Sequence, residues 1–229
     1  MLKVVTALIG MAAVAAAAGW PVQAQPTGRI GVVGVVGQWI EEKDGADAAV
    51  RVNGVPGTVP AAAEIERSAA TLFGKLDPAF AANAGSANAF SLGVLSNVPR
   101  FTEGTFRVRF KLVSGGSDQT AGLVFDLEPS GEYLYARYNT KDGNLALWRY
   151  AKGNREVIAH GEQHLQLPLD TWHELAVTIA GTRLTVDANN GALRFEHPLP
   201  EAVDGRIGFW TKRDSVTLFK DVRVTPRPK

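Results

Sequence analysis

The chain has 229 residues with 24 basic and 23 acidic side chains, so its formal net charge is only +1. Nucleic-acid-binding domains usually have a large basic excess, and we therefore expect no nucleic-acid partner. The sequence contains no cysteine, which excludes a structural disulfide and the lipid-bearing cysteine of a lipoprotein.

The N-terminus has the pattern of a secretory signal peptide. Lys3 precedes an apolar run from Val4 to Gly19, and the small-residue spacing Val22-Gln23-Ala24 follows it. A signal peptidase recognises such spacing, so residues 1–24 are predicted to be removed. The run is shorter than the ~20 residues that span a bilayer, although an uncleaved anchor is the alternative. We predict a periplasmic or secreted protein with no membrane anchor after cleavage.

The N-terminal third of the remaining chain mixes several kinds of segment. Residues 30–40 are apolar and predict a strand that ends near Trp39, whereas residues 43–60 read as a loop rich in glycine and proline. Residues 77–88 are rich in Ala and Asn and predict a covering loop. Between residues 60 and 74, four apolar side chains recur at helical spacing and predict one short helix: Ile65, Ala69, Leu72 and Phe73. Residues 54–89 look like an insertion.

The rest of the chain alternates apolar and polar residues in short runs. In Phe106-Arg107-Val108-Arg109-Phe110-Lys111-Leu112, the apolar side chains share one face and the basic ones share the other, which predicts a half-buried antiparallel strand. Asp142-Gly143 predicts a tight type I′ hairpin. The other predicted strands are residues 90–95, 121–127, 133–138, 145–150, 172–179, 183–188, 206–211 and 215–224. We expect residues 25–229 to form a single β-sandwich domain.

Four stretches carry a resemblance to a known family. They are FTEGTFRVRFKLVSGGSDQTAGLVFDL, YLYARYNTKDGNLALWRY, TWHELAVTIAGTRLTVDANNG and GRIGFWTKRDSVTLFKDVRV. In their order and content they resemble the 3-keto-disaccharide hydrolase domain family, which has a concanavalin A-like or laminin G-like jelly roll. The resemblance implies an all-β fold, an antiparallel two-sheet jelly-roll sandwich, with the one short helix added in the N-terminal third. It also implies keto-sugar hydrolase or lyase chemistry, with Asp126, Arg137 and Lys212 as the candidate catalytic residues.

Laminarinase-type glycosidases on this fold use a strand with E-x-D-x-x-E or E-x-D-x-E, and neither motif is present. Asp126 and Glu128 stand two apart and can form an acid/base pair. The alternative, which ordinary strand alternation favours, is a solvated strand face neutralised by Arg109 or Lys111. No cofactor or metal motif is present, because the pair His160 and His164 lacks the H-E-x-x-H context.

Aromatic side chains form the predicted sugar-binding surface. Tyr133 and Tyr135 share a strand face with Arg137, and Trp148 shares one with Tyr150 on the next strand. Such rings stack on sugars while a guanidinium meets the hydroxyls; equally, the rings can be core residues, because periodicity does not say which face is buried.

Trp210 stands beside the polar run from Thr211 to Ser215, which predicts either a ligand rim or a solvated hairpin. Arg109 joins the predicted groove with Asp126, Tyr135, Arg137 and Lys212.

Two functions remain open at this point. The first is an exported carbohydrate-binding or sugar-processing domain with a glycan or small sugar as its ligand. The second is a non-catalytic envelope module with a structural or protein-interaction role. Residues 54–89 separate the two hypotheses, because a segment folded over the sugar-facing sheet excludes a ligand from it.

Overall fold

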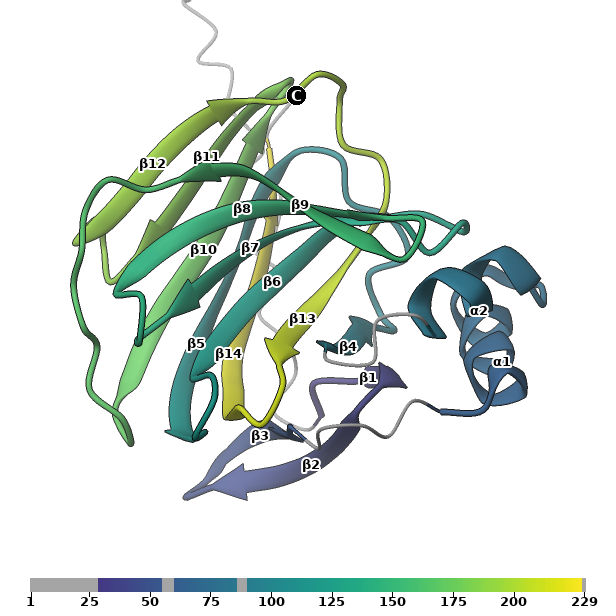
Figure 1. Ribbon diagram of the computed structural model, residues 1–229, viewed down its shortest axis with the longest axis horizontal. Coiled ribbons are helices and arrows are strands. Elements are labelled where there is room, and N and C mark those ends of the chain that lie inside the picture. Colours follow the sequence, from purple (N-terminus) through teal and green to yellow (C-terminus); the bar gives the residue numbers. More distant parts are fainter. Residues whose placement is uncertain (1–28, 55–59, 86–89, 228–229) are drawn as a thin grey trace, which may run out of the picture.

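The computed structural model describes residues 29–54, 60–85 and 90–227, and the predicted signal peptide lies outside these ranges. Within them the chain forms two seven-stranded antiparallel sheets packed face to face (Figure 1). The front sheet, nearer the viewer in Figure 1, has the order β1 (Val32–Val36), β4 (Phe90–Leu95), β13 (Arg206–Lys212), β6 (Thr120–Leu127), β7 (Tyr133–Asn139), β8 (Asn144–Ala151) and β9 (Asn154–His160). The back sheet has the order β12 (Leu193–Pro198), β11 (Arg183–Ala188), β10 (Trp172–Ala180), β5 (Gly104–Ser114), β14 (Val216–Pro226), β3 (Asp47–Asn53) and β2 (Gln38–Asp44).

The main core lies between the two sheets, and strand β5 shows how the sequence builds it. Phe106, Val108, Phe110 and Leu112 are each 0% exposed, while Arg109 between them faces solvent. Burial of each of these apolar side chains stabilises the folded state by about 1.5–3 kcal/mol. The alternation predicted from the sequence is therefore confirmed, and so is the jelly-roll sandwich that depends on it.

Tight turns place neighbouring strands in register. Tyr135 pairs with Trp148 across the β7–β8 hairpin, and Asn139 pairs with Asn144 at its end. Gly143 has a φ of 68°, a left-handed conformation that glycine adopts without a steric penalty. The hairpin predicted at Asp142-Gly143 is confirmed, but its type I′ turn is not: four residues, 140–143, separate the paired Asn139 and Asn144, and only Gly143 among them has a positive φ. The register then fixes which side chains of β7 and β8 share a face.

The N-terminal strands correct two predictions. The strand expected over residues 30–40 is divided at Gly37, whose φ of 87° turns the chain from β1 in the front sheet into β2 in the back sheet. The loop expected over residues 43–60 contains strand β3, which pairs with β2 through a turn at Gly45. The charges before that turn are typical of loops, and they concealed a hairpin whose buried face is Val50 and Val52.

The described part of the insertion, residues 60–85, contains two helices instead of the one predicted. The predicted helix is confirmed as α1 (Ala62–Phe73), with Ile65, Ala69 and Leu72 buried. The segment predicted as a covering loop contains a second helix, α2 (Pro78–Gly85). Asp77 accepts hydrogen bonds from the backbone N–H groups of Ala79 and Phe80, at 3.0 and 3.4 Å. An Asp before a Pro is a helix-start signal, which the Ala- and Asn-rich composition obscured.

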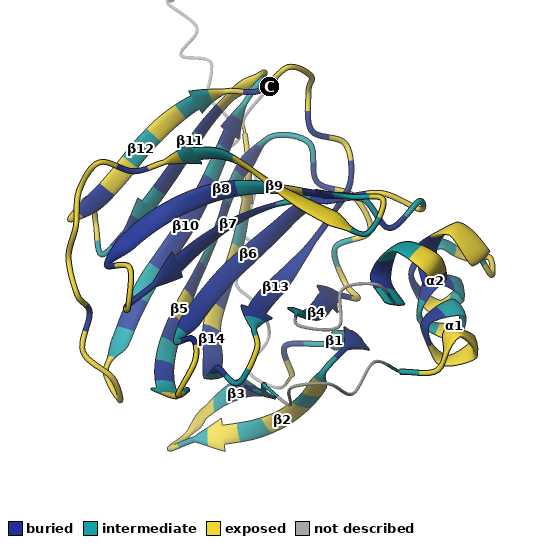
Figure 2. Cartoon of the chain, in the orientation of Figure 1, coloured by how far each residue is buried: buried dark blue, intermediate teal, exposed yellow. Residues whose placement is uncertain are grey.

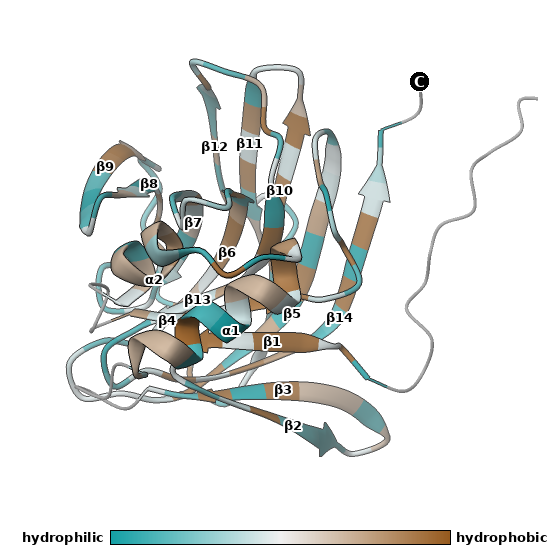
Figure 3. Ribbon diagram, turned by 90° about the vertical axis from the view of Figure 1, so that its right-hand side faces the viewer, coloured by the Kyte–Doolittle hydropathy of each residue, from teal (hydrophilic) through white to brown (hydrophobic). Residues whose placement is uncertain are grey.

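Both helices lie beside β1 on the outer side of the front sheet, the side that faces away from the main core (Figures 1 and 3). Their buried residues form a second apolar cluster with side chains of β4, β6, β7, β8 and β13. No helix in the described ranges is long and apolar enough to cross a membrane.

Candidate functional site

The candidate site is the outer face of the front sheet, where one row of side chains crosses five strands. Strand register places Trp210 of β13, Gly122 of β6, Arg137 of β7, Ala146 of β8 and His160 of β9 in this row. Along this row, the large side chains of Trp, Arg and His alternate with Gly and Ala. Arg137 stands between Gly122 and Ala146, which leave room in the row for its long side chain, and it is 8% exposed.

One half of this face is aromatic. Tyr135 stacks on Trp210 at 4.3 Å between ring centroids, and Tyr133 stacks on Tyr150 at 4.9 Å. Helix α2 closes this half from outside, because the Tyr150 hydroxyl donates a 2.8 Å hydrogen bond to the Asn83 carbonyl. The rings thus belong to the apolar cluster beneath the helices.

The burial of these rings decides what they can do. Tyr133, Tyr135 and Trp210 are 3%, 1% and 1% exposed, so none presents a ring face on which a sugar could stack. Figure 2 shows most of β7 and β13 in the dark blue of buried residues. Trp148 is half-buried. Within the described residues, the aromatic part of the predicted sugar-binding surface serves as packing.

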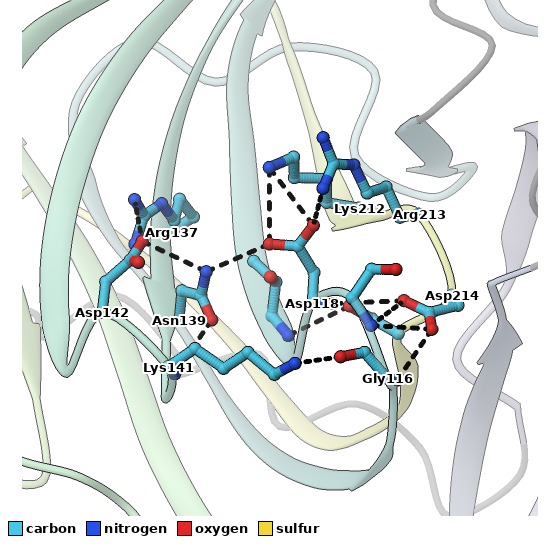
Figure 4. A network of polar contacts seen from close by, with 12 residues as sticks. Gly116, Asp118, Arg137, Asn139, Lys141, Asp142, Lys212, Arg213 and Asp214 are labelled. Carbon is cyan, nitrogen blue, oxygen red and sulfur yellow. Dashed lines mark hydrogen bonds and ion pairs between the residues drawn. The ribbon is translucent and has the colours of Figure 1, made fainter.

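The other half of the face is polar and forms one connected network (Figure 4). The side-chain nitrogen of Asn139 donates to Asp118 Oδ1 at 3.2 Å and to Asp142 Oδ2 at 3.1 Å. Arg137 binds the same Asp142 oxygen at 2.8 Å, and Lys212 pairs with both carboxylate oxygens of Asp118. Fixed donors and acceptors therefore alternate across two strands, β7 and β13, and two turns.

The turn after β13 completes the network. Arg213 pairs with Asp118 Oδ2 at 3.4 Å, so this carboxylate contacts two cations. Asp214 accepts hydrogen bonds from the backbone N–H groups of Gly116, Ser117 and Asp118. These bonds hold the pKa of Asp214 below its usual value, with Ser117 as the largest cause. The carboxylate of Asp214 thus fixes the loop that presents Asp118.

Burial changes the ionisation of the groups in the centre of the face. It raises the pKa of Tyr135 to about 12, although the positive charge of Arg155 acts in the opposite direction. Burial also lowers the pKa of Arg137, which the Asp142 carboxylate partly offsets. The tyrosine is therefore neutral and the arginine charged at neutral pH.

The structure brings some of the predicted site residues together and separates others. Tyr135, Arg137 and Lys212 share the outer face of the front sheet. Arg109 lies on the back sheet, where it pairs with Asp221 at 3.6 Å. A single groove containing Arg109 and Arg137 is therefore not formed, because the two strands belong to different layers.

Asp126, the third predicted catalytic residue, lies four positions beyond Gly122 along β6 and away from the polar network. Its φ is 55°, and its carboxylate accepts a 2.8 Å hydrogen bond from the backbone N–H of Asp204. Burial raises the pKa of Asp126. This geometry anchors the loop before β13.

Sequence reasoning missed three members of the network: Asp118, Asn139 and Asp142. Asp142 was assigned to a turn, and the alternation of β7 placed Asn139 on the same face as Tyr135 and Arg137 without indicating a partner. The shared face of Arg137 and Asn139 is the signal that could have indicated polar partners near the end of β7, and so could have pointed to Asp142 in the adjoining turn. Only the sheet order brings Asp118 to the same place.

The two carboxylates of the network are close together but already engaged. Both Asp118 and Asp142 contact one nitrogen of Asn139, and each also pairs with a cation. A retaining glycosidase needs one of its two carboxyl groups as a proton donor. Asp118, Asn139 and Arg137 are buried, so the arrangement suits binding of hydroxyl groups at the half-exposed side chains of Asp142 and Arg213 better than glycosidic cleavage. Among the described residues there is no group of three or more His, Asp or Glu side chains placed to hold a metal ion.

A separate hollow of about 410 Å³ lies where β9 and β12 face each other at one edge of the sandwich. His160, Glu162, Arg194 and Phe195 line it. Arg194 pairs with Glu196 at 3.0 Å and with Asp187 at 3.9 Å, so its charge is neutralised locally.

No protein-family model matches the sequence, and no curated protein is significantly similar to it. The fold is similar to the carbohydrate-binding module CBM66 from Bacillus subtilis, with 14% identity, a TM-score of 0.61, and coverage of 87% of this chain and 100% of that one. It is also similar to a protein of unknown function with a galectin-like fold from Bacillus subtilis, with 12% identity, a TM-score of 0.53, and coverage of 85% and 88%. A β-glucanase from Bacillus licheniformis has 12% identity and a TM-score of 0.42 over 60% and 71%.

At these identities the first two likenesses show the fold alone. They do not confirm the narrower resemblance to the 3-keto-disaccharide hydrolase domain family. The chain is a concanavalin A-like or galectin-like jelly-roll sandwich whose structural neighbours include a carbohydrate-binding module.

Proposed function

We propose that this protein is an exported glycan-binding domain that holds its ligand on the polar half of the outer face of the front sheet. The observation that carries the proposal is the network in which Asn139 joins Asp118 to Asp142 and Arg137 (Figure 4). Sugar hydroxyls both donate and accept hydrogen bonds, so they need donors and acceptors fixed at short spacing. The carbohydrate-binding module among the structural neighbours supports the same assignment.

Export is part of the proposal and has its own support in the sequence. Lys3, the apolar run to Gly19 and the Val22-Gln23-Ala24 spacing form a signal-peptide pattern. Glycans are abundant outside the cytoplasm, so the destination and the ligand class agree.

Binding is favoured over hydrolysis of a 3-keto-disaccharide. That activity, implied by the family resemblance, would combine Asp126, Arg137 and Lys212. Arg137 and Lys212 are parts of the polar network, but Asp126 is occupied in holding Asp204 at another place on the sheet. The network retains a ligand without requiring a proton donor.

The alternative is a non-catalytic envelope module that binds another protein. The observation in its favour is the position of α1 and α2, which cover the aromatic half of the face. The helices pack over the rings of Tyr133 and Tyr150, whereas the polar network gathers at the opposite end of β7, from Arg137 to Asp142. The two functions therefore predict different surfaces for the ligand.

Titration of the protein with neutral and acidic oligosaccharides, followed by protein NMR, tests the proposal. We expect shifts in the amide signals of Asn139 and Asp142, and we expect the Asp142→Ala variant to lose at least about tenfold in affinity through lost charge-assisted hydrogen bonds. Asp170→Asn, a turn substitution on another loop, is the matched control. Absence of shifts with every glycan class would refute the proposal.

A further inference from the structure

Arg155 is an exposed arginine of β9 whose guanidinium lies over two aromatic rings of the front sheet. Its guanidinium carbon is 4.7 Å from the ring centroid of Trp148 and 5.2 Å from that of Phe90. Two aromatic rings thus hold this cation in place, which a guanidinium allows because it is planar and weakly hydrated.

Among the described residues, the ion pairs of this sheet engage Arg137 and Arg149 but not Arg155. On the neighbouring strand β8, Arg155 pairs with Tyr150, and the next pair along the two strands is Arg149 with Glu156. Arg149 pairs with Glu132 at 3.2 Å, whereas the contacts of Arg155 among the described residues are with the rings of Trp148 and Phe90 and with the side chain of Tyr135. A guanidinium that is held in place without an ion pair can offer two parallel N–H donors to a carboxylate or a sulfate.

The charges around Arg155 add to this effect. Arg137 stands on the same face, and the charge of Arg155 acts with burial to lower the pKa of Arg137. The two carboxylates of the network, Asp118 and Asp142, are already taken by Lys212, Arg213 and Arg137. Neither carboxylate of the network therefore pairs with Arg155.

Trp148 holds the guanidinium of Arg155 in position. Its indole lies between Tyr135, with nearly parallel planes at 11° and centroids 6.3 Å apart, and the guanidinium of Arg155. His160 approaches Trp148 with its ring at 84° to the indole plane. The indole face is thus occupied by Arg155, and Trp148 acts as a positioning residue for that cation.

We infer that the ligand is an anionic sugar, whose carboxylate or sulfate ester pairs with Arg155 while its hydroxyls bind the network of Arg137, Asn139 and Asp142. This inference rests on the proposed glycan-binding function and narrows its ligand class. A uronic acid and a sulfated sugar share the required chemistry, namely a planar or tetrahedral anion that accepts two parallel N–H donors.

Calorimetric titration with three matched probes tests the inference: oligogalacturonate, the same oligosaccharide with its carboxylates methyl-esterified, and a sulfated neutral oligosaccharide. We expect an anionic probe to bind at least about tenfold more tightly than the methyl ester. Tighter binding of oligogalacturonate identifies a uronate, and tighter binding of the sulfated probe identifies a sulfate ester.

The variant Arg155→Gln removes the charge and retains most of the side chain. We expect it to lose about tenfold in affinity for the anionic probe and to bind the methyl ester unchanged, whereas Arg183→Gln, on the distant strand β11, leaves both affinities unchanged. Thermal unfolding of each variant shows that it is folded.

Equal binding of the ester and the anion, or an Arg155→Gln variant with full affinity for the anion, would overturn the inference and leave the glycan-binding function standing. Failure of all three probes and of neutral glycans would overturn both. The two failures are therefore distinguishable.

Discussion

The hydroxyl of Tyr150 donates a 2.8 Å hydrogen bond to the backbone carbonyl of Asn83, which lies 67 residues earlier in the chain. The bond joins helix α2 to strand β8 beneath the helical insertion. Tyr150 is 1% exposed, so its hydroxyl must find a partner within the protein. The insertion is consequently a packed layer over the aromatic half of the sheet.

Substitution of Tyr150 by Phe tests this attachment. The ring stacking on Tyr133 is retained, while the Asn83 carbonyl loses the hydroxyl donor. We expect the free energy of unfolding to fall by about 0.5–1.5 kcal/mol, as for a typical intramolecular hydrogen bond. Urea denaturation gives this difference, and faster hydrogen exchange in residues 78–85 would locate it; unchanged exchange there would contradict the proposed attachment.

A second prediction concerns acid stability. Asp44 accepts hydrogen bonds from Lys220 at 2.9 Å, Lys111 at 3.2 Å and the Trp172 indole at 2.9 Å. The bonds from Lys220 and Lys111 lower the pKa of Asp44 to about 2. The folded pKa is below the unfolded one, so Asp44 contributes stability above about pH 4 that is lost as the pH falls towards 2.

The Asp44→Asn variant should therefore be less stable than the wild type at neutral pH and should show a smaller stability loss between about pH 4 and pH 2. Chemical denaturation across this pH range measures both effects. Asp170→Asn is the control, because Asp170 lies on a loop with a φ of 52° that Asn tolerates. An acid limb as steep in Asp44→Asn as in the wild type would contradict the assignment.

The Asp214 carboxylate should hold the loop that presents Asp118. Replacement of Asp214 by Ala leaves three backbone N–H groups without this acceptor. Water can replace part of the lost bonding because the loop is largely exposed, so we expect a modest loss of about 1 kcal/mol in stability. Hydrogen exchange of residues 116–118 should accelerate. The affinity for a glycan should also fall, because the loop that Asp214 holds carries Asp118 into the network. Protection equal to that of the wild type would show that the loop is held by other contacts.

Close backbone approach at Gly208 gives a fourth prediction. A Cβ atom at this position would lie 2.1 Å from the Gly93 carbonyl oxygen of the neighbouring strand β4. Gly208→Ala should therefore force β13 and β4 apart and destabilise the protein by about 1–3 kcal/mol. The melting temperature measures the loss. Gly45→Asn is the control, since nothing lies within 4 Å of a Cβ there and Asn tolerates its φ of 66°. A melting temperature equal to that of the control would contradict the close approach.

Local patterns in the sequence were sufficient for much of the fold. The alternation from Phe106 to Leu112, the turn at Asp142-Gly143 and the helical spacing of Ile65, Ala69 and Leu72 each predicted the observed element. These signals work because side-chain direction has a period of 2.0 residues in a strand and 3.6 in a helix. These signals fail in edge strands whose two faces are both polar. Strands β9 and β12 were not predicted because they lie at the edges of their sheets and few of their side chains are buried.

The sequence by itself determined that β5 has one buried face and that Tyr135 and Arg137 share a face of β7. Only the tertiary structure decided which layer lies over that face, because burial depends on strand order and on the packing of α1 and α2. It placed Arg109 on the back sheet and joined Asp118 to Asn139, 21 residues apart, in one polar network. Periodicity reports the direction of a side chain along its own strand, whereas the partner of that side chain comes from strands distant in the sequence.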